Sequence, residues 1–209
     1  MKRNSLVALV AVLLLTAAPQ VMGWNVQRER LTYDVMYKWG LINKKAGSVS
    51  LDTHPHASKK QFNAVLTGAT APWADHFFML RDTLMGTINT TDFLPEYYEK
   101  IAHEGGAYDR DLLYYTRTGN KVKAEATLWR RRKKETVVTR SEQIHEAEGI
   151  TLDMLSSFYY MRQLPFQKMK QGESVRLNVF SGKKKEILTI HFQGTEDVKI
   201  GKKQYPAYH

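Results

Sequence analysis

The stretch LTYDVMYKW, residues 31–39, alternates apolar and more polar side chains along its whole length. One face carries Leu31, Tyr33, Val35, Tyr37 and Trp39, and the other carries Thr32, Asp34, Met36 and Lys38. A period of two residues is typical of a β-strand that buries one face and exposes the other. The segment therefore predicts that the fold begins with a sheet that has one buried face.

Similar stretches recur along the chain, separated by turn residues such as Gly105-Gly106 and Thr118-Gly119-Asn120. Glycine and asparagine mark hairpin turns because they tolerate the backbone angles that tight turns require. On this pattern we predict further strands at residues 46–53, 61–69, 81–87, 96–103, 108–117, 121–130, 134–140, 174–181, 186–193 and 198–205.

Two segments depart from the strand pattern. After Pro72, the aromatic residues have spacings that suit a short helix or a bulky capping loop. Thr151 can cap a second helix, which Pro165 ends. The apolar residues of that second helix recur with a helical period and are Leu152, Leu155, Phe158, Tyr159 and Met161.

Many short strands with one or two short helices indicate a mainly β fold. We expect a curved antiparallel sheet that forms an open or partly closed barrel, with the helices packed on it. Neither a repeat of fixed period nor a shift in composition divides the chain, so we expect a single domain over residues 24–209. A sheet that curls in this way has a concave interior, which is where a ligand can bind.

The first 23 residues have the three parts of a secretory signal peptide. Lys2 and Arg3 provide the positive start, and residues 6–18 form an apolar stretch that is shorter than a membrane span. Pro19 then breaks the helix, and cleavage is expected before Trp24. We therefore predict an exported, periplasmic protein with no transmembrane span after cleavage; an uncleaved membrane anchor is the alternative interpretation.

The composition limits the chemistry. The chain has no cysteine, which excludes disulfides, a thiol nucleophile and the lipid-bearing cysteine of a lipoprotein. It has 31 Lys and Arg against 21 Asp and Glu, a formal charge of +10 that falls to +8 without Lys2 and Arg3. Outside the cytoplasm we expect no nucleic acid partner, and the available anions are lipid head groups, acidic glycans and cell-wall polymers. Solubility alone explains the charge equally well.

Three segments resemble the DUF3108 family of exported bacterial proteins: LTYDVMYKWGLINKKAGSVSL, FLPEYYEKIAHEGGAYDRDLLYYT and LDMLSSFYYMRQLPF. The resemblance implies a half-barrel similar to periplasmic lipoprotein carriers. It assigns no function and no functional residue. Members of the family extend beyond the equivalent of Tyr205, so the resemblance also implies that this chain lacks its C-terminal strands and exposes strand edges that can associate.

Candidate catalytic and metal-binding residues are few, and we assign no catalytic, cofactor-binding or metal-binding residue. His54 and His56 flank Pro55 in a turn, a context that favours an ordinary surface loop over a metal site. The sequence contains neither a G-x-S-x-G nucleophile elbow nor a phosphate-binding glycine loop. Five acidic residues could serve glycoside hydrolysis if two of them faced each other: Glu96, Glu99, Glu104, Asp109 and Asp111.

We expect a carrier or binding protein for an apolar or amphipathic envelope ligand rather than an enzyme. The candidate apolar pocket is formed by Trp73, Phe77, Phe78, Phe158 and Tyr159, which are otherwise core residues. The candidate anion contact is formed by Arg130, Arg131, Arg132, Lys133 and Lys134, which are otherwise a solvated hairpin tip. The alternatives are a hydrolase of glycan or cell wall that uses acids near Glu104, and a structural subunit that pairs through strand edges.

Overall fold

The structure, a computed structural model, describes residues 26–39 and 42–209. The expected signal peptide and the cleavage site before Trp24 lie outside the described residues. Gly40, in the first predicted turn, also lies outside them. No helix in the described part of the chain is long and apolar enough to cross a membrane.

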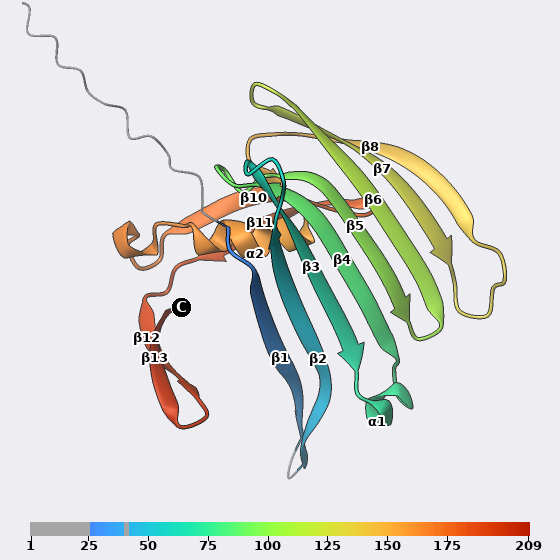
Figure 1. The fold of residues 1–209 in the computed structure, drawn as a ribbon, viewed down its shortest axis with the longest axis horizontal. Helices are drawn as coiled ribbons and strands as arrows, with labels where there is room; N and C mark the ends of the chain where they lie inside the picture. Colours follow the sequence, from blue (N-terminus) through green and yellow to red (C-terminus); the bar gives the residue numbers. More distant parts are fainter. Residues whose placement is uncertain (1–25, 40–41) are drawn as a thin grey trace, which may run out of the picture.

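Eight strands form one antiparallel sheet in which each strand pairs with its neighbour in the sequence (Figure 1). They are β1 (Glu29–Trp39), β2 (Ile42–Pro55), β3 (Gln61–Thr70), β4 (Leu80–Asn89), β5 (Pro95–Glu104), β6 (Ala107–Thr118), β7 (Lys121–Arg131) and β8 (Thr139–Glu148). A four-residue helix, α1 (Pro72–Asp75), joins β3 to β4. Connections between consecutive strands alternate between the two ends of this meander.

The rest of the chain forms smaller elements. The strand β9 (Thr151–Leu152), the helix α2 (Met154–Arg162) and the 3-10 turn η1 (Phe166–Lys168) lead into β10 (Ser174–Ser181) and β11 (Lys184–His191). The strands β9, β10 and β11 make a three-stranded sheet, and β12 (Thr195–Ile200) pairs with β13 (Lys203–Tyr208) as a separate hairpin. The strand β11 is thus an edge, and Lys184 and Lys185 on it are exposed charges of the kind that limits edge pairing.

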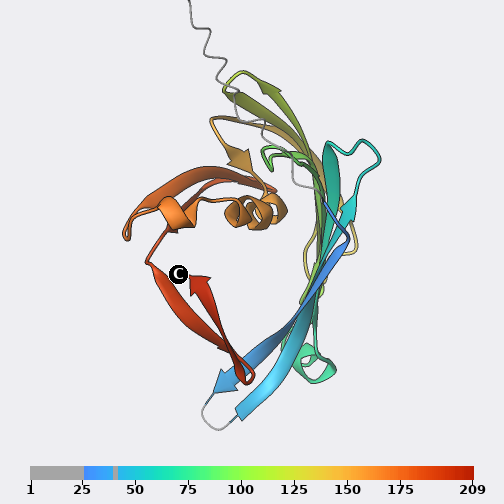
Figure 2. The ribbon, with the colours of Figure 1, turned by 60° about the vertical axis from the view of Figure 1, so that its left-hand side comes forward.

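The large sheet is curved and open, and α2 and the C-terminal strands lie on its concave side (Figure 2). The sheet does not close, because β1 and β8 are its two edges within the described residues. The prediction of a mainly β fold with an open, curved antiparallel sheet and short helices is confirmed.

The core lies between the concave face and α2. Phe62 is completely buried, and its ring meets that of Tyr159 at 4.9 Å and 61°. The Tyr159 hydroxyl lies 2.8 Å from the Thr53 hydroxyl on β2. Leu155 packs where Gly86 leaves room, since a Cβ at Gly86 would lie 3.3 Å from Leu155 Cδ2. The helix is therefore fixed on β2, β3 and β4 through apolar contacts and the buried Tyr159–Thr53 hydrogen bond.

The helix α2 begins at a different cap from the predicted one. Asp153, not Thr151, is the N-cap residue, and its carboxylate accepts hydrogen bonds from the amides of Leu155 and Ser156. Thr151 instead belongs to β9, where it pairs with Asn178 of β10. Burial raises the pKa of the Asp153 carboxyl to about 7, although the two amides oppose this shift.

Two predicted strands were placed incorrectly. The strand predicted at residues 134–140 begins only at Thr139, because residues 132–135 form a turn in which Lys134 has a φ of 72°. The stretch predicted as one strand at residues 198–205 is a hairpin, which turns at Gly201 with a φ of 62°. At both places basic and small residues form a turn. The alternation of apolar and polar residues continues through each turn, which is why it predicted a strand there.

The turn between β10 and β11 is anchored on the concave face of the large sheet. The carbonyl oxygen of Gly182 accepts hydrogen bonds from Gln143 Nε2 at 3.0 Å and from His145 Nε2 at 2.8 Å. A Cβ added to Gly182 would overlap the carboxylate of Asp111, and the φ of Gly182 is 55°. Glycine is therefore required here by both the backbone conformation and the close approach.

We predict that Gly182→Ala destabilises the protein by about 1 to 3 kcal/mol more than Gly119→Ala. Both glycines have a positive φ, and nothing lies within 4 Å of a Cβ at Gly119, so the pair isolates the contact with Asp111. The free energy of unfolding measured in urea tests this. Equal losses in the two variants would show that the hairpin turn does not press on Asp111.

Candidate functional site

The concave face extends beyond the area that α2 covers. In the register of the sheet Tyr33 lies opposite Val49, Val49 opposite Gly68 and Gly68 opposite Asp82. This row is two residues along from the row that contains Leu31 and therefore shares its face. Because Leu31 packs against the core, the row also points to the concave side.

Large apolar side chains remain exposed on the β1 part of this face. Tyr33 and Val35 share the face of Leu31, yet they are 52% and 48% exposed. Leu31 itself is only partly buried. Apolar side chains on the concave side of a sheet are normally covered by the rest of the fold, so this part of the face is available to a ligand.

The helix α2 presents apolar side chains to the same region. Leu155 and Tyr159 pack into the main core, and Tyr160 also contacts the smaller cluster around β9 and β10. At 100° per residue, Phe158 and Met154 project from the remaining flank, and they are 46% and 40% exposed. This flank is turned away from β10.

The end of α2 lies over β1. The guanidinium of Arg162 pairs with the carboxylate of Glu29 at 2.7 Å. Tyr33 also contributes to the raised pKa of Arg162, of which the main cause is the hydrogen bond to Glu29. We group the exposed apolar side chains of these two neighbouring elements, Tyr33 and Val35 on β1 and Phe158 and Met154 on α2, as the apolar part of the candidate site.

A charged part of the site lies on the neighbouring strands. Lys100 Nζ is 3.4 Å from Glu104 Oε1 and 4.0 Å from Asp82 Oδ2. Burial, followed by the hydrogen bond and the charge of Glu104, raises the pKa of Asp82 to about 6. Asp82 Oδ1 is buried and has no hydrogen-bond partner among the described residues. Asp82 therefore keeps its proton to a higher pH than an exposed aspartate does.

A second ion pair extends the charged part toward β7. Arg130 contacts the Asp111 carboxylate, and its Nε lies 3.3 Å from Asp109 Oδ1. The Asp111 side chain is 10% exposed and the Arg130 side chain 19%. These residues lie beneath the Gly182 turn described above. The pair therefore joins the hairpin to the sheet and completes a band of opposite charges.

The five aromatic residues predicted to form the pocket lie in two places. Phe158 and Tyr159 are on α2, where Tyr159 is core and Phe158 is exposed. Trp73, Phe77 and Phe78 are at α1, at one end of the sheet, where Phe77 is 84% exposed. Phe158 therefore belongs to the apolar part of the site, whereas the α1 aromatics form a different surface.

The predicted basic run is also divided. Arg130 points to the concave face and is paired there. Arg131 donates to the carbonyl oxygens of Gly106 and Glu135, and Arg132, Lys133 and Lys134 are exposed in the connection from β7 to β8.

The predicted acids are divided in the same way. Glu104, Asp109 and Asp111 belong to the charged band. Glu99 lies on the outer face, where it accepts a hydrogen bond from Arg110 at 2.6 Å. Glu96 is bonded to the Gln61 amide.

The histidines do not form a metal site among the described residues, where no group of three His, Asp or Glu residues has metal-binding geometry. His56 Nδ1 lies 3.0 Å from Ser58 Oγ within the β2–β3 turn. His54 is partly buried at the end of β2.

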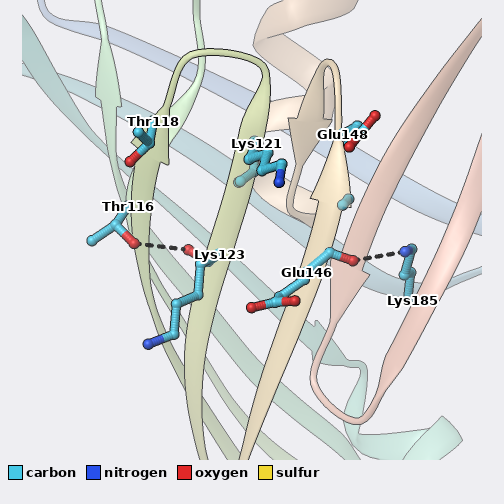
Figure 3. A pocket seen from close by; sticks show the side chains of 9 residues that line it. Thr116, Thr118, Lys121, Lys123, Glu146, Glu148 and Lys185 are labelled. Carbon is cyan, nitrogen blue, oxygen red and sulfur yellow. Dashed lines mark hydrogen bonds between the residues drawn. The ribbon is translucent and has the colours of Figure 1, made fainter.

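Two open hollows lie along the sheet. One of about 550 Å³ lies at the ends of β6, β7 and β8, where Lys185 Nζ donates to the Glu146 carbonyl at 2.7 Å (Figure 3). Its lining includes three lysines and two glutamates: Lys121, Lys123, Lys185, Glu146 and Glu148. Another, of about 630 Å³, crosses β1 to β5 and includes Ser50 and Thr67, whose hydroxyls are 2.8 Å apart. The lining of this second hollow also includes Tyr33, Val49 and Asp82 from the row described above, so it reaches the β1 part of the candidate site.

Sequence reasoning missed Asp82, Lys100, Tyr33 and Val35 as site residues. Tyr33 and Val35 were predicted to face inward. Their strand is the first of the meander and therefore an edge of the sheet, a position that could have suggested exposure. Asp82 and Lys100 are far from Asp111 in the sequence, and only the register of β4, β5 and β6 places them together.

The sequence model of a family described as "Protein of unknown function (DUF3108)" matches residues 32–209. No curated protein and no solved structure matches the chain.

We predict that the protein loses stability as the pH rises from about 4 to about 6, by up to about 3 kcal/mol through Asp82. The folded protein holds the Asp82 proton more tightly than the unfolded chain, so deprotonation favours unfolding. In Asp82→Asn this part of the decline should be absent. Glu125→Gln is the control, because Lys123 lowers the pKa of Glu125. Parallel curves of unfolding free energy against pH for wild type and Asp82→Asn would contradict the prediction.

Proposed function

The chain belongs to the DUF3108 family of proteins of unknown function, and from the chemistry of its concave face we propose that it binds an apolar or amphipathic ligand there. The observation that supports this most strongly is the exposed apolar surface of Tyr33, Val35, Phe158 and Met154, which two separate elements turn toward the same region. Exposed apolar patches on a soluble protein often mark the sites where ligands or partners bind.

The size of this surface is sufficient for useful affinity. Burying roughly 300 Å² of an acyl chain or a similar apolar group at about 25 cal/mol per Å² gives about 7 kcal/mol before the cost of association. Micromolar binding therefore requires no covalent or metal chemistry.

The charged band indicates how the ligand is oriented. Its apolar part would lie between β1 and α2, and its polar head would point toward Asp82 and Lys100 on β4 and β5. The band contains four carboxyl groups and two cations: Asp82, Glu104, Asp109, Asp111, Lys100 and Arg130. Because Arg130 is already paired, the band favours a neutral, zwitterionic or cationic head over an anionic one.

Hydrolysis of glycan or cell wall by the acids near Glu104 fits this geometry less well. Glycoside hydrolases hold their two carboxyl groups about 5 to 9 Å apart. Asp82 and Glu104 instead both lie near the same cation, Lys100 Nζ, at 4.0 Å and 3.4 Å. Carboxyl groups gathered around one lysine do not have the arrangement of two acids that face each other across a cleft, and we therefore favour binding over hydrolysis.

We further propose that the protein is exported and works in the cell envelope. The support is in the sequence, in which two basic residues, an apolar stretch at residues 6–18 and Pro19 precede the expected cleavage site at Trp24. An exported binding protein would meet lipids and other amphiphiles of the envelope, which have the chemistry that the concave face accommodates.

We predict that Tyr33→Asn and Phe158→Asn each weaken the binding of a fluorescent lysophosphatidylcholine, which has a zwitterionic head, by about tenfold, because each removes apolar area from the site. Fluorescence titration measures the dissociation constants. The matched control is Ile144→Asn, in which an apolar side chain that is 60% exposed on the outer face of β8 is replaced. If all three variants bind like wild type, or if Ile144→Asn weakens binding equally, the concave face is not the site.

We predict that the protein purified from its native envelope begins at Trp24, within a residue or two. Intact mass spectrometry gives the N-terminus directly. Recovery of the chain with Met1 intact in the membrane fraction would show that the apolar stretch is an anchor and would remove the support for an exported, soluble binding protein.

A further inference from the structure

One end of the large sheet gathers three of its connections. The helix α1, the β5–β6 turn at Gly105 and Gly106, and the β7–β8 connection all lie at this end (Figure 1). The opposite end carries the β2–β3, β4–β5 and β6–β7 turns. We call the first group of connections the α1 rim.

The connections of the α1 rim contact one another. A Cβ added to Gly105 would lie 3.0 Å from Phe78 Cε2, so the Phe78 ring packs against the β5–β6 turn. A Cβ added to Gly106 would lie 3.4 Å from Lys133 Cγ, so the Lys133 stem packs against the same turn. The rim is therefore one continuous surface that runs from α1 to the β7–β8 connection.

This rim exposes large apolar side chains. Phe77 is 84% exposed and Phe78 is 50% exposed, while Val137 and Val138 of the β7–β8 connection are 69% and 43% exposed. Phe77 is held outward by the Trp73 ring, which it meets edge to face at 6.2 Å. Side chains this apolar rarely point into water from a loop unless something covers them.

Cations surround the apolar side chains. Arg131 ends β7, and Arg132, Lys133 and Lys134 follow it in the β7–β8 connection. On the other side of the rim, Lys44 Nζ lies 4.6 Å from the centre of the Trp73 ring. Two further cations at this end are paired, Lys45 with Asp34 and Arg81 with Asp75. The nearest carboxylate in the same connection is Glu135, which accepts a hydrogen bond from the Arg132 amide. The rim is therefore strongly positive.

We propose that the α1 rim docks the protein onto a membrane surface that contains anionic lipid. Exposed aromatic side chains insert at the boundary between head groups and acyl chains, and the surrounding Lys and Arg contact the anionic head groups. An acidic polysaccharide would satisfy the cations, but it offers nothing apolar for Phe77 and Val137. The combination of the two kinds of side chain on one continuous surface therefore favours lipid.

This docking does not depend on the ligand proposed for the concave face. Its residues are separate from Tyr33, Val35, Phe158 and Met154, so variants at one surface leave the other unchanged. A protein that docks but does not bind the fluorescent lysophosphatidylcholine would disprove the proposed function alone, and the reverse result would disprove the docking alone.

The experiment uses the absence of cysteine from the chain. A single cysteine introduced as Val137→Cys is labelled with an environment-sensitive fluorophore, and Asn120→Cys places the same label at the opposite end of the sheet. We expect vesicles of phosphatidylglycerol, but not of phosphatidylcholine, to shift the emission of the Val137→Cys label to the blue. The shift should weaken as salt is added, because salt screens the cations. The Asn120→Cys label should not respond.

Charge variants in the Val137→Cys background separate the rim from the overall positive charge. Arg132→Gln, Lys133→Gln and Lys134→Gln together should reduce partitioning into phosphatidylglycerol vesicles by at least about tenfold. Lys59→Gln, Lys60→Gln and Lys121→Gln remove three exposed cations from the opposite end and should have little effect. Equal losses in the two triple variants, no emission shift at Val137→Cys, an equal shift with phosphatidylcholine, or binding to a soluble acidic polysaccharide but not to vesicles would each overturn the proposal.

Discussion

The sheet has more concave surface than the rest of the described chain covers. Its strands have ten to fourteen residues, which at about 3.3 Å per residue makes them over 30 Å long. The helix α2 has nine residues, so it is about 14 Å long and about 10 Å wide, and it crosses the strands rather than following them. It covers Phe62 and its neighbours completely, whereas Tyr33 and Val35 remain exposed on the same face.

The position of α2 follows from a few buried contacts. Asp153 starts the helix, Leu155 fits over Gly86, and Tyr159 bonds to Thr53. The Gly182 turn fixes the charged band in a similar way. It packs closely against Asp111 and accepts hydrogen bonds from Gln143 and His145. Because the helix and the turn are each anchored to the sheet, the gap in coverage stays in one place. A binding site requires this kind of rigid surround.

The sequence predicts the parts of this fold that depend on local patterns. Alternation located β1, β3 and β10 almost to the residue, because one face of each is apolar and the other polar. It did not locate β8, whose inward residues include Gln143 and His145. These side chains are polar because they bond to a turn 37 to 39 residues away. Likewise, Thr151 and Asp153 are both good caps, and only the pairing of β9 with β10 decides between them.

The site depends on register, which no local pattern supplies. The charged band follows cross-strand pairs from β4 to β7, so its acids come from distant parts of the sequence. Register also places the band close to the α1 rim, since Glu104 directly precedes the Gly105 turn and Arg130 directly precedes Arg131. The same register places Tyr33 level with Asp82 and Val35 two residues closer to the rim, so the apolar and charged parts of the site lie side by side across the sheet. A ligand that meets both parts would therefore lie across the strands, with its apolar part at β1 and its polar head at β4 and β5.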